Sequence, residues 1–247
     1  MRPDICLIAP TNGSTFQVRL AMTIPPAWKP AAVVFDCDGL LVDTETCWAV
    51  AESEIFARAG LSFGPQQKAL LIGKSVADEA REIAKAIGGD RNARDIEIEL
   101  LELASQAVGL GAVAMPGALS IVERIGRVLP IAVASNSPRR LLDLALERGK
   151  LARKFRVSIA ADEVAAPKPA PEMYLEACRR LGVAPDQALA FEDSMTGVLA
   201  AKAAGMKVIC IPTLEAMEYP ADAVFDSLDD VRLLGWLSGW AWSHAHS

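Results

Sequence analysis

The stretch Ala32-Val-Val-Phe-Asp36-Cys-Asp38-Gly-Leu-Leu-Val-Asp-Thr-Glu45 decides the fold, because apolar residues run directly into two aspartates. A short apolar run bounded by polar residues and a glycine predicts a buried strand. In an open α/β sheet, ligand sites form beyond the carboxyl ends of the strands. Asp36 and Asp38 cannot both stay charged in an apolar core. They therefore require a metal ion, a proton or a cationic group of a substrate.

Further apolar runs downstream predict a sheet built from strands that alternate with helices. The predicted strands are residues 31–35, 130–134, 157–160, 188–191, 207–211 and, more weakly, 223–225. Helical periodicity separates them at residues 117–128, 138–149, 171–182 and 196–204. This alternation predicts an α/β fold, with a doubly wound, Rossmann-like parallel sheet and helices on both faces.

The segment between the first two strands breaks this alternation. Residues 46–60, 75–88 and 92–108 have helical patterns, with residues 61–73 and 88–92 as linkers. We expect an all-α helical cap inserted into the core and joined to it near Val42–Thr46 and Gly111–Pro116. Such a cap can close over the aspartates and exclude water.

The expected organisation divides the chain into four parts. These are an N-terminal extension (1–30), a core domain (31–45 and 114–235), a helical cap (46–113) and a C-terminal tail (236–247). We expect the extension to be poorly ordered. After a final helix on the core, we expect the tail to be frayed, so His244 and His246 are not expected to bind a metal.

Composition restricts the classes of partner. The chain has 247 residues, 52% of them hydrophobic, and a formal net charge of −6, which argues against nucleic acid and anionic membranes. No apolar run approaches the ~18–20 residues of a membrane span. Five cysteines without a C-x-x-C pair favour a cytoplasmic location, and Cys37 should point into the core. Both a monomer and a homodimer are compatible with the sequence.

Polar residues follow two other predicted strands. Ser135-Asn136 can form an anion site at a strand end, while Ser137 and Pro138 can begin the next helix. Lys168 lies among prolines that fix the backbone and aim its side chain, which favours a functional lysine over a solvated one.

Glu192-Asp193 follows the strand at 188–191. Asp193 or Ser194 could cap the next helix, and both acids could supply oxygen ligands to a hard cation. Four carboxylates at neighbouring strand ends would repel one another, and Mg²⁺ relieves such repulsion. The sequence therefore predicts a Mg²⁺ site at this edge of the sheet.

The order of these motifs resembles the haloacid dehalogenase superfamily. Asp36-x-Asp38-Gly39, Ser135-Asn136, Lys168-Pro and Glu192-Asp193 follow in sequence, and the predicted cap lies between the first two. The runs 36–45 and 191–197 are similar to its capped phosphatase and β-phosphoglucomutase-like branch. The resemblance covers about residues 31–235.

The resemblance implies a role for each matching residue. Asp36 would be the nucleophile that forms an aspartyl phosphate, and Asp38 the general acid and base. Lys168 would hold Asp36 in place and contact the phosphoryl group. The residues that would bind that group are Gly39, Ser135, Asn136 and Lys168, and those that would bind Mg²⁺ are Asp36, Asp38, Glu192 and Asp193.

The resemblance also separates several activities. An acid at Asp38 disfavours the dehalogenases and the phosphonatases, and Lys74 is not expected to form a Schiff base. Related sugar phosphomutases carry a histidine and an arginine in the cap where this chain has Trp48 and Val76. This favours a phosphatase of a small phosphorylated metabolite. A sugar phosphomutase and a non-catalytic phosphate-binding regulator remain the alternatives.

Two further positions bear on the substrate. Lys74, in the turn Gly73-Lys74-Ser75, either contacts the substrate or is a solvated lysine beside a helix cap at Ser75. Trp48 and Phe56 are the other cap candidates for substrate choice. Glu172 stands where the family often has aspartate, and we expect it to change only outer hydrogen bonds.

Overall fold

The computed structural model describes residues 24, 28–72, 74–213 and 217–240, and strands of this part of the chain form one parallel sheet. The strand order is β3-β2-β1-β4-β5-β6. The strands are β1 (Ala32–Phe35), β2 (Ile131–Ser135), β3 (Val157–Ala160), β4 (Ala188–Glu192), β5 (Lys207–Cys210) and β6 (Ala223–Val224). Every predicted strand is present within one residue of its expected ends, and the doubly wound α/β fold is confirmed.

Helices cover both faces of the sheet, because strand side chains alternate between them. Val33 and Phe35 of β1 pack in one apolar cluster and Val34 in another. The first cluster includes residues of α5 (Ala118–Gly126), α6 (Arg139–Arg148) and α9 (Val231–Ser238). The second includes residues of α7 (Glu172–Leu181) and α8 (Met195–Ala203). Both faces of the central strand are therefore buried.

Prolines and polar side chains mark where several helices begin. Pro138 and Pro171 are the N-cap residues of α6 and α7. A cap at Ser137 would start α6 at Pro138, but the helix starts one residue later, at Arg139. Ser194 caps α8, since its Oγ accepts the N–H of Gly197 at 3.1 Å.

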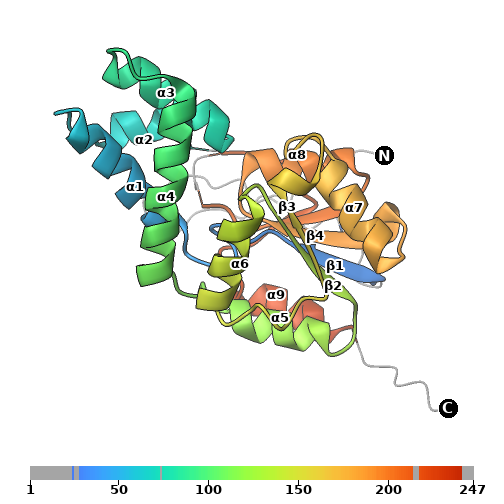
Figure 1. The fold of residues 1–247 in the computed structure, drawn as a ribbon. Helices are drawn as coiled ribbons and strands as arrows, with labels where there is room; N and C mark the ends of the chain where they lie inside the picture. Colours follow the sequence, from blue (N-terminus) through green and yellow to red (C-terminus); the bar gives the residue numbers. More distant parts are fainter. Residues whose placement is uncertain (1–23, 25–27, 73, 214–216, 241–247) are drawn as a thin grey trace, which may run out of the picture.

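The first four helices after β1 form a separate lobe, seen at the upper left of Figure 1. They are α1 (Glu45–Arg58), α2 (Pro65–Leu71), α3 (Val76–Ile87) and α4 (Ala93–Gly111). The linker predicted for residues 61–73 is wrong, because α2 lies within it. Seven residues are too few to show a helical period. Pro65 stands in the first turn of α2, and Gln67 Oε1 accepts the N–H of Gly64 at 3.1 Å.

The two segments that connect this lobe to the core lie side by side. The N–H of Asp43 donates to the carbonyl of Val113, and the N–H of Met115 donates to that of Leu41, each at 2.9 Å. The lobe is therefore attached through one paired crossing. The residue bounds of a core and a cap domain stay a prediction.

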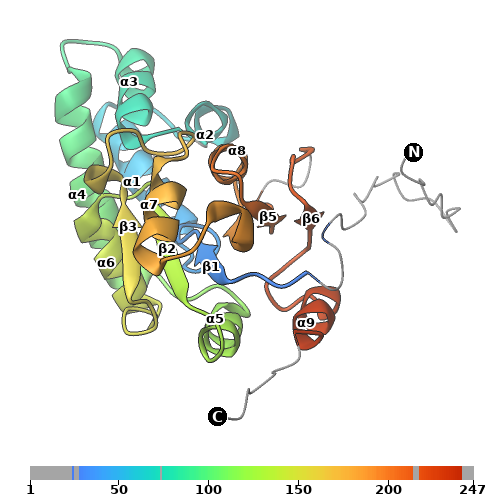
Figure 2. The same ribbon diagram turned by 90° about the vertical axis from the view of Figure 1, so that its right-hand side faces the viewer.

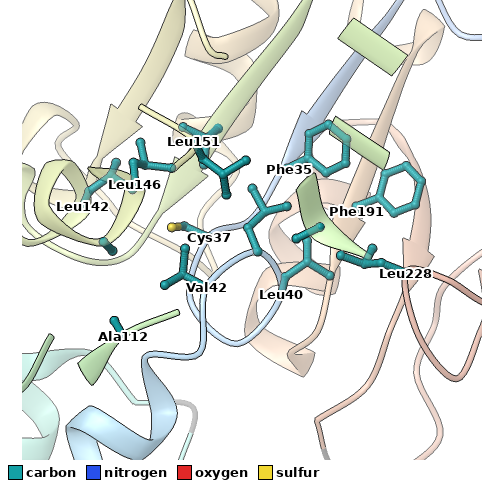
Figure 3. Close-up of a cluster of buried hydrophobic side chains, with 14 of the residues drawn as sticks. Phe35, Cys37, Leu40, Val42, Ala112, Leu142, Leu146, Leu151, Phe191 and Leu228 are labelled. Carbon is teal, nitrogen blue, oxygen red and sulfur yellow. The ribbon is translucent and has the colours of Figure 1, made fainter. Parts of the chain in front are cut away.

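An apolar cluster supports the turn that follows β1 (Figure 3). The rings of Phe35 and Phe191 stack with centroids 5.1 Å apart. Cys37 is fully buried, and Figure 3 shows it near Leu146 and Leu151 of the core. The expectation that Cys37 points into the core is confirmed, while the aspartates on either side of it do not enter this cluster.

The described C-terminal end is a helix packed on the core, as expected. Helix α9 runs to Ser238, and the ring of Trp240 packs on that of Trp236 with centroids 4.9 Å apart, so Trp236, Leu237 and Trp240 are part of the packed core. Figure 2 shows α9 against the body of the molecule. His244 and His246, like the expected extension up to residue 23, lie outside the described residues.

The described cysteines Cys37, Cys47, Cys178 and Cys210 are buried free thiols. Among the residues that the structure describes, no helix combines the length and apolarity that crossing a bilayer requires.

Candidate active site

The predicted site residues come together because β2, β1 and β4 are adjacent and parallel. Their carboxyl ends therefore lie at one edge of the sheet. The N–H of Asp36 donates to the carbonyl of Phe191 at 2.9 Å, which extends the pairing of β1 with β4 by one residue. This bond places the residues after β1 beside Glu192 and Asp193.

Lys168 is the centre of this edge. Its Nζ donates to Asp36 Oδ1 at 2.5 Å, to Glu192 Oε1 at 2.6 Å and to the carbonyl of Ala134 at 2.8 Å. The lysine is buried, as are both carboxylates. Burial alone would lower the pKa of Lys168, but the charges of Asp36 and Glu192 raise it well above its usual value. Lys168 is therefore a fixed positive charge between two acids.

The loop that carries Lys168 is held by the residue after β2. Asn136 Oδ1 accepts the N–H of Lys168 at 2.9 Å, and Asn136 Nδ2 donates to the carbonyl of Lys168 at 3.1 Å. Glu172 Oε2 accepts the N–H of Ala166 at 2.8 Å in the same loop, so the expected role of Glu172 in outer hydrogen bonds is confirmed. Asn136 thus positions the lysine in addition to lining the cavity described below.

Three carboxylates form an acidic cluster in front of the lysine. Asp36, Glu192 and Asp193 each offer an oxygen, and these oxygens lie within 4.8 Å of one another. Burial raises the pKa of Asp36 well above its usual value, and Glu192 and Asp193 add to the rise. Burial and the neighbouring Glu192 also raise the pKa of Asp193 to about 8. One lysine does not balance this charge, so the cluster favours a bound cation.

Asp38 has a different environment from Asp36. Its carboxylate accepts the hydroxyl of Thr44 at 2.8 Å and the hydroxyl of Ser135. Ser135 Oγ in turn accepts the N–H of Ser137 at 2.9 Å. Asp38 is not part of the three-carboxylate cluster. Two aspartates of one strand end therefore face different partners, and Ser135 supports Asp38 in this structure.

Two glycines allow the acidic cluster to form. Gly39 has a φ of +78°, and a Cβ there would lie 2.5 Å from Asp193 Oδ2. At Gly197 in α8, a Cβ would lie 2.0 Å from the carboxylate of Glu192. The N–H of Gly39 donates to the carbonyl of Val42 at 3.0 Å. In this structure Gly39 closely approaches Asp193, and its expected contact with the phosphoryl group stays a prediction.

Three residues of the site were not found from the sequence. Tyr174 is buried and donates its hydroxyl to Glu192 Oε1, and Thr213 donates to Asp193 Oδ2. Thr44 donates to Asp38, as described above. Thr213 lies shortly after β5, so its place at a strand end was a usable signal. Tyr174 reaches the site from the buried face of α7 and gives no such signal.

A cavity of about 560 Å³ lies between this edge of the core and the helical lobe. Asp36, Asp38 and Lys168 line it from the core, and Trp48 and Lys74 line it from the lobe. Phe56 is not among the lining residues; it packs on Phe63 at 5.3 Å between ring centroids. Phe56 is therefore part of the lobe's own core and not a candidate for substrate choice.

Ser75 and Lys74 of the lobe have defined partners. Ser75 caps α3 through its Oγ, which accepts the N–H of Asp78 at 3.2 Å. Lys74 Nζ lies 3.4 Å from Glu82 Oε1. The helix-cap interpretation of Ser75 is confirmed, and Lys74 lines the cavity while paired to an acid of α3.

Comparisons with known proteins agree with this geometry. The sequence profile of the family described as "Haloacid dehalogenase-like hydrolase" matches residues 33–211. The chain is 34% identical to (DL)-glycerol-3-phosphatase 1 of Arabidopsis thaliana, over 93% of this chain and 81% of that protein. It is 30% identical to the bifunctional riboflavin kinase/FMN phosphatase of the same plant, over 83% of this chain, and spans about half (55%) of that protein.

A solved structure extends the comparison to the fold. The crystal structure of CbbY from Rhodobacter sphaeroides in complex with phosphate superposes with a TM-score of 0.76. It is 27% identical in sequence, and the match covers 85% of this chain and all of that one (100%).

Proposed function

The chain belongs to the haloacid dehalogenase-like hydrolase family, and we propose that it is a Mg²⁺-dependent phosphatase of a small phosphorylated metabolite. Relatives named as phosphatases of glycerol phosphate and of hexitol phosphate support hydrolysis of a phosphate monoester. The intermediate, the metal and the residue roles are our proposal.

The observation that carries this proposal is the contact of Lys168 Nζ with Asp36 Oδ1 at 2.5 Å inside a covered cavity. Phosphoryl transfer requires in-line positioning and positive charge beside the equatorial oxygens. A buried lysine fixed beside a carboxylate nucleophile supplies both. The same lysine cannot be a solvated surface residue, because it is 5% exposed.

The two aspartates take different steps in the proposed reaction. Asp36 attacks phosphorus and forms an aspartyl phosphate, which divides the reaction into two steps. Asp38 protonates the leaving oxygen and later removes a proton from the attacking water. The hydroxyls of Thr44 and Ser135 orient the Asp38 carboxyl for this transfer. The lobe above the cavity limits access of water to the intermediate.

The residues present fit a magnesium ion. The oxygens of Asp36, Glu192 and Asp193 lie within 4.8 Å of one another and are hard ligands in a region of excess negative charge. We propose that these carboxylates and the backbone carbonyl of Asp38 hold Mg²⁺. When bound, the ion supplies positive charge to the transferring phosphoryl group.

A phosphate-release assay tests this proposal. The protein is incubated with a panel of phosphorylated metabolites and Mg²⁺, with p-nitrophenyl phosphate as a generic substrate. We expect phosphate release that a chelator abolishes and that added Mg²⁺ restores. Hydrolysis that persists in excess chelator would overturn the metal assignment.

The same assay separates the alternatives. A phosphomutase would convert a sugar phosphate into its isomer without releasing phosphate, and a regulator would bind without turnover. Trp48 lines the cavity at the position where related mutases are expected to carry a histidine, which favours transfer to water.

A further inference from the structure

The helical lobe contributes a wall of charged side chains to the cavity. Besides Trp48, the charged residues that line it from α1, α2, α3 and the turn before α3 are Glu45, Glu52, Lys68, Lys74 and Glu79. Three carboxyl groups and two ammonium groups therefore line the cavity from the lobe. The proposed chemistry uses none of these residues, so they are available to bind the part of the substrate that leaves.

Both lysines of this wall form ion pairs with neighbouring acids. Lys68 Nζ donates to both oxygens of Glu52 at 3.0 Å and lies 3.4 Å from Glu45 Oε2. Lys74 Nζ lies 3.4 Å from Glu82 Oε1. A second phosphate group on the substrate would meet no unpaired lysine among the described residues of the wall, and it would face carboxylates instead. The wall therefore disfavours bisphosphates.

Glu79 differs from the other acids of the wall. It lines the cavity from α3, yet its Oε2 is shut off from solvent and has no hydrogen-bond partner among the described residues. A buried polar atom without a partner costs free energy, and a ligand can relieve that cost. Burial and the nearby charge of Glu52 raise the pKa of Glu79 to about 8, so the carboxyl is mainly neutral at pH 7. A neutral carboxyl can donate and accept one hydrogen bond each, as a hydroxyl can.

We propose that Glu79 is a specificity residue that binds a hydroxyl of the leaving group, so that the substrates are monophosphate esters of polyols or sugars. This inference rests on the proposed phosphatase function. It names the class of substrate within it: one phosphate beside Asp36, and an uncharged, hydroxyl-bearing chain that extends toward α3. A second anionic group at the far end would find no free ammonium group among the described residues of the wall, because Lys68 and Lys74 are already paired to acids.

A matched pair of substrates tests the contact. Glycerol 3-phosphate and propyl phosphate share the ester and the chain length but differ in their hydroxyls. We expect Glu79→Leu to lower kcat/KM for glycerol 3-phosphate by about 10- to 100-fold and to change that for propyl phosphate less than about threefold. Glu79→Gln, which keeps a donor and an acceptor, should retain the preference within about fivefold.

Glu102→Leu is the control, because it also replaces a glutamate of the lobe with leucine but lies outside the cavity. Glu102 is an exposed residue of α4 and does not line the cavity. We expect its kinetics on both substrates to match the wild type. If Glu79→Leu lowers kcat/KM for both substrates by the same factor, Glu79 has a structural role only, and the inference is overturned. A wild-type enzyme that does not prefer glycerol 3-phosphate also overturns it.

The second arm compares fructose 6-phosphate with fructose 1,6-bisphosphate. We expect the monophosphate to have a kcat/KM at least about tenfold higher, because the second phosphate of the bisphosphate would lose hydration without gaining an unpaired lysine among the described residues of the lobe wall. Equal kcat/KM values for the two substrates would show that the cavity accepts a second phosphate group.

Failure of the proposed function gives a different result. In that case neither the pair nor p-nitrophenyl phosphate releases phosphate. Calorimetric binding of glycerol 3-phosphate and propyl phosphate to the wild type with Mg²⁺ then decides the inference without turnover. Equal affinities, or equal losses in Glu79→Leu, would overturn it.

Discussion

The two walls of the cavity are built on opposite principles. On the core wall, Lys168 contacts three acceptors and Asp38 accepts two hydroxyls, so the reacting groups are fixed before any substrate arrives. On the lobe wall, an oxygen of Glu79 is buried without a hydrogen-bond partner among the described residues. Fixed groups suit chemistry, which gains from preorganisation, whereas an unsatisfied group suits recognition, because a ligand completes it.

The largest expected effect removes the nucleophile of the core wall. Asp36→Asn should lower kcat by at least about 10⁴-fold, because an amide oxygen is a poor nucleophile for phosphorus. Binding of glycerol 3-phosphate, measured by calorimetry, should survive the change. A variant that keeps a tenth of the wild-type rate would show that another residue attacks.

The second effect disturbs the packing that fixes the acidic cluster. In Gly197→Ala, the new Cβ would lie 2.0 Å from the Glu192 carboxylate, so Glu192 must move. We expect a loss of about 10²- to 10³-fold in kcat/KM and about 1–3 kcal/mol in the free energy of unfolding. Urea denaturation and steady-state kinetics measure the two.

Gly235→Ala in α9 is its control, because nothing lies within 4 Å of a Cβ there. Replacing a glycine inside a helix should stabilise the protein by about 0.5–1 kcal/mol without a change in kinetics. Equal behaviour of the two variants would argue against the close approach at Gly197.

The third prediction concerns how the stability that Glu79 of the lobe wall contributes depends on pH. The folded-state pKa of Glu79 is about 8, above its ordinary value of 4.5. Burial is the main cause, and the charges of Glu52 and Glu45 raise the pKa further, while those of Lys68 and Lys74 lower it. The folded state therefore binds this proton more tightly. The stability that it contributes is full below pH 4.5 and is lost as the pH rises through about 8.

Glu79→Gln removes this titration. Between pH 5 and pH 8.5, the wild type should lose on the order of 2–4 kcal/mol more of its free energy of unfolding than the variant. Urea denaturation at both pH values measures the difference, with Glu102→Gln as a control that should follow the wild type. Parallel pH profiles for Glu79→Gln and the wild type would mean that the Glu79 carboxyl is solvated.

The smallest effect is expected at Tyr174, which contacts a proposed metal ligand but not the substrate. Tyr174→Phe removes the hydroxyl that donates to Glu192 and leaves the ring in place. We expect about a tenfold increase in the Mg²⁺ concentration at half-maximal activity, since residues that orient metal ligands typically change affinity by about 10- to 100-fold. An unchanged Mg²⁺ requirement would show that Glu192 is held by its other partners alone.

Local patterns predicted the strands well because each strand is an apolar run with polar residues at its end. The same patterns missed α2, whose seven residues are stabilised by a proline, a glutamine and burial of Leu71. They indicated a final helix on the core without its end, which the structure places at Ser238. Short elements depend on packing partners far away in the sequence, and periodicity does not carry that information.

The candidate site divides in the same way. Asp36, Asp38, Lys168, Glu192 and Asp193 could be predicted, because parallel strands bring their carboxyl ends to one edge whatever the details of packing. Tyr174 and the cavity role of Glu79 could not. Tyr174 lies on a helix whose face toward β1 and β2 is set by the packing of α7 on the sheet.

The sequence by itself determined the α/β class, the position of the inserted helices and the identity of the acids and the lysine at the strand ends. These depend on hydrophobic period and on chain order, which are local properties. Which acid meets which partner follows from the tertiary structure: Asp36 meets Lys168, and Asp38 meets Thr44 and Ser135. One oxygen of Glu79 has no partner among the described residues. The physical reason is that burial and charge pairing depend on distances of a few ångströms between segments far apart in the chain, which no local pattern specifies.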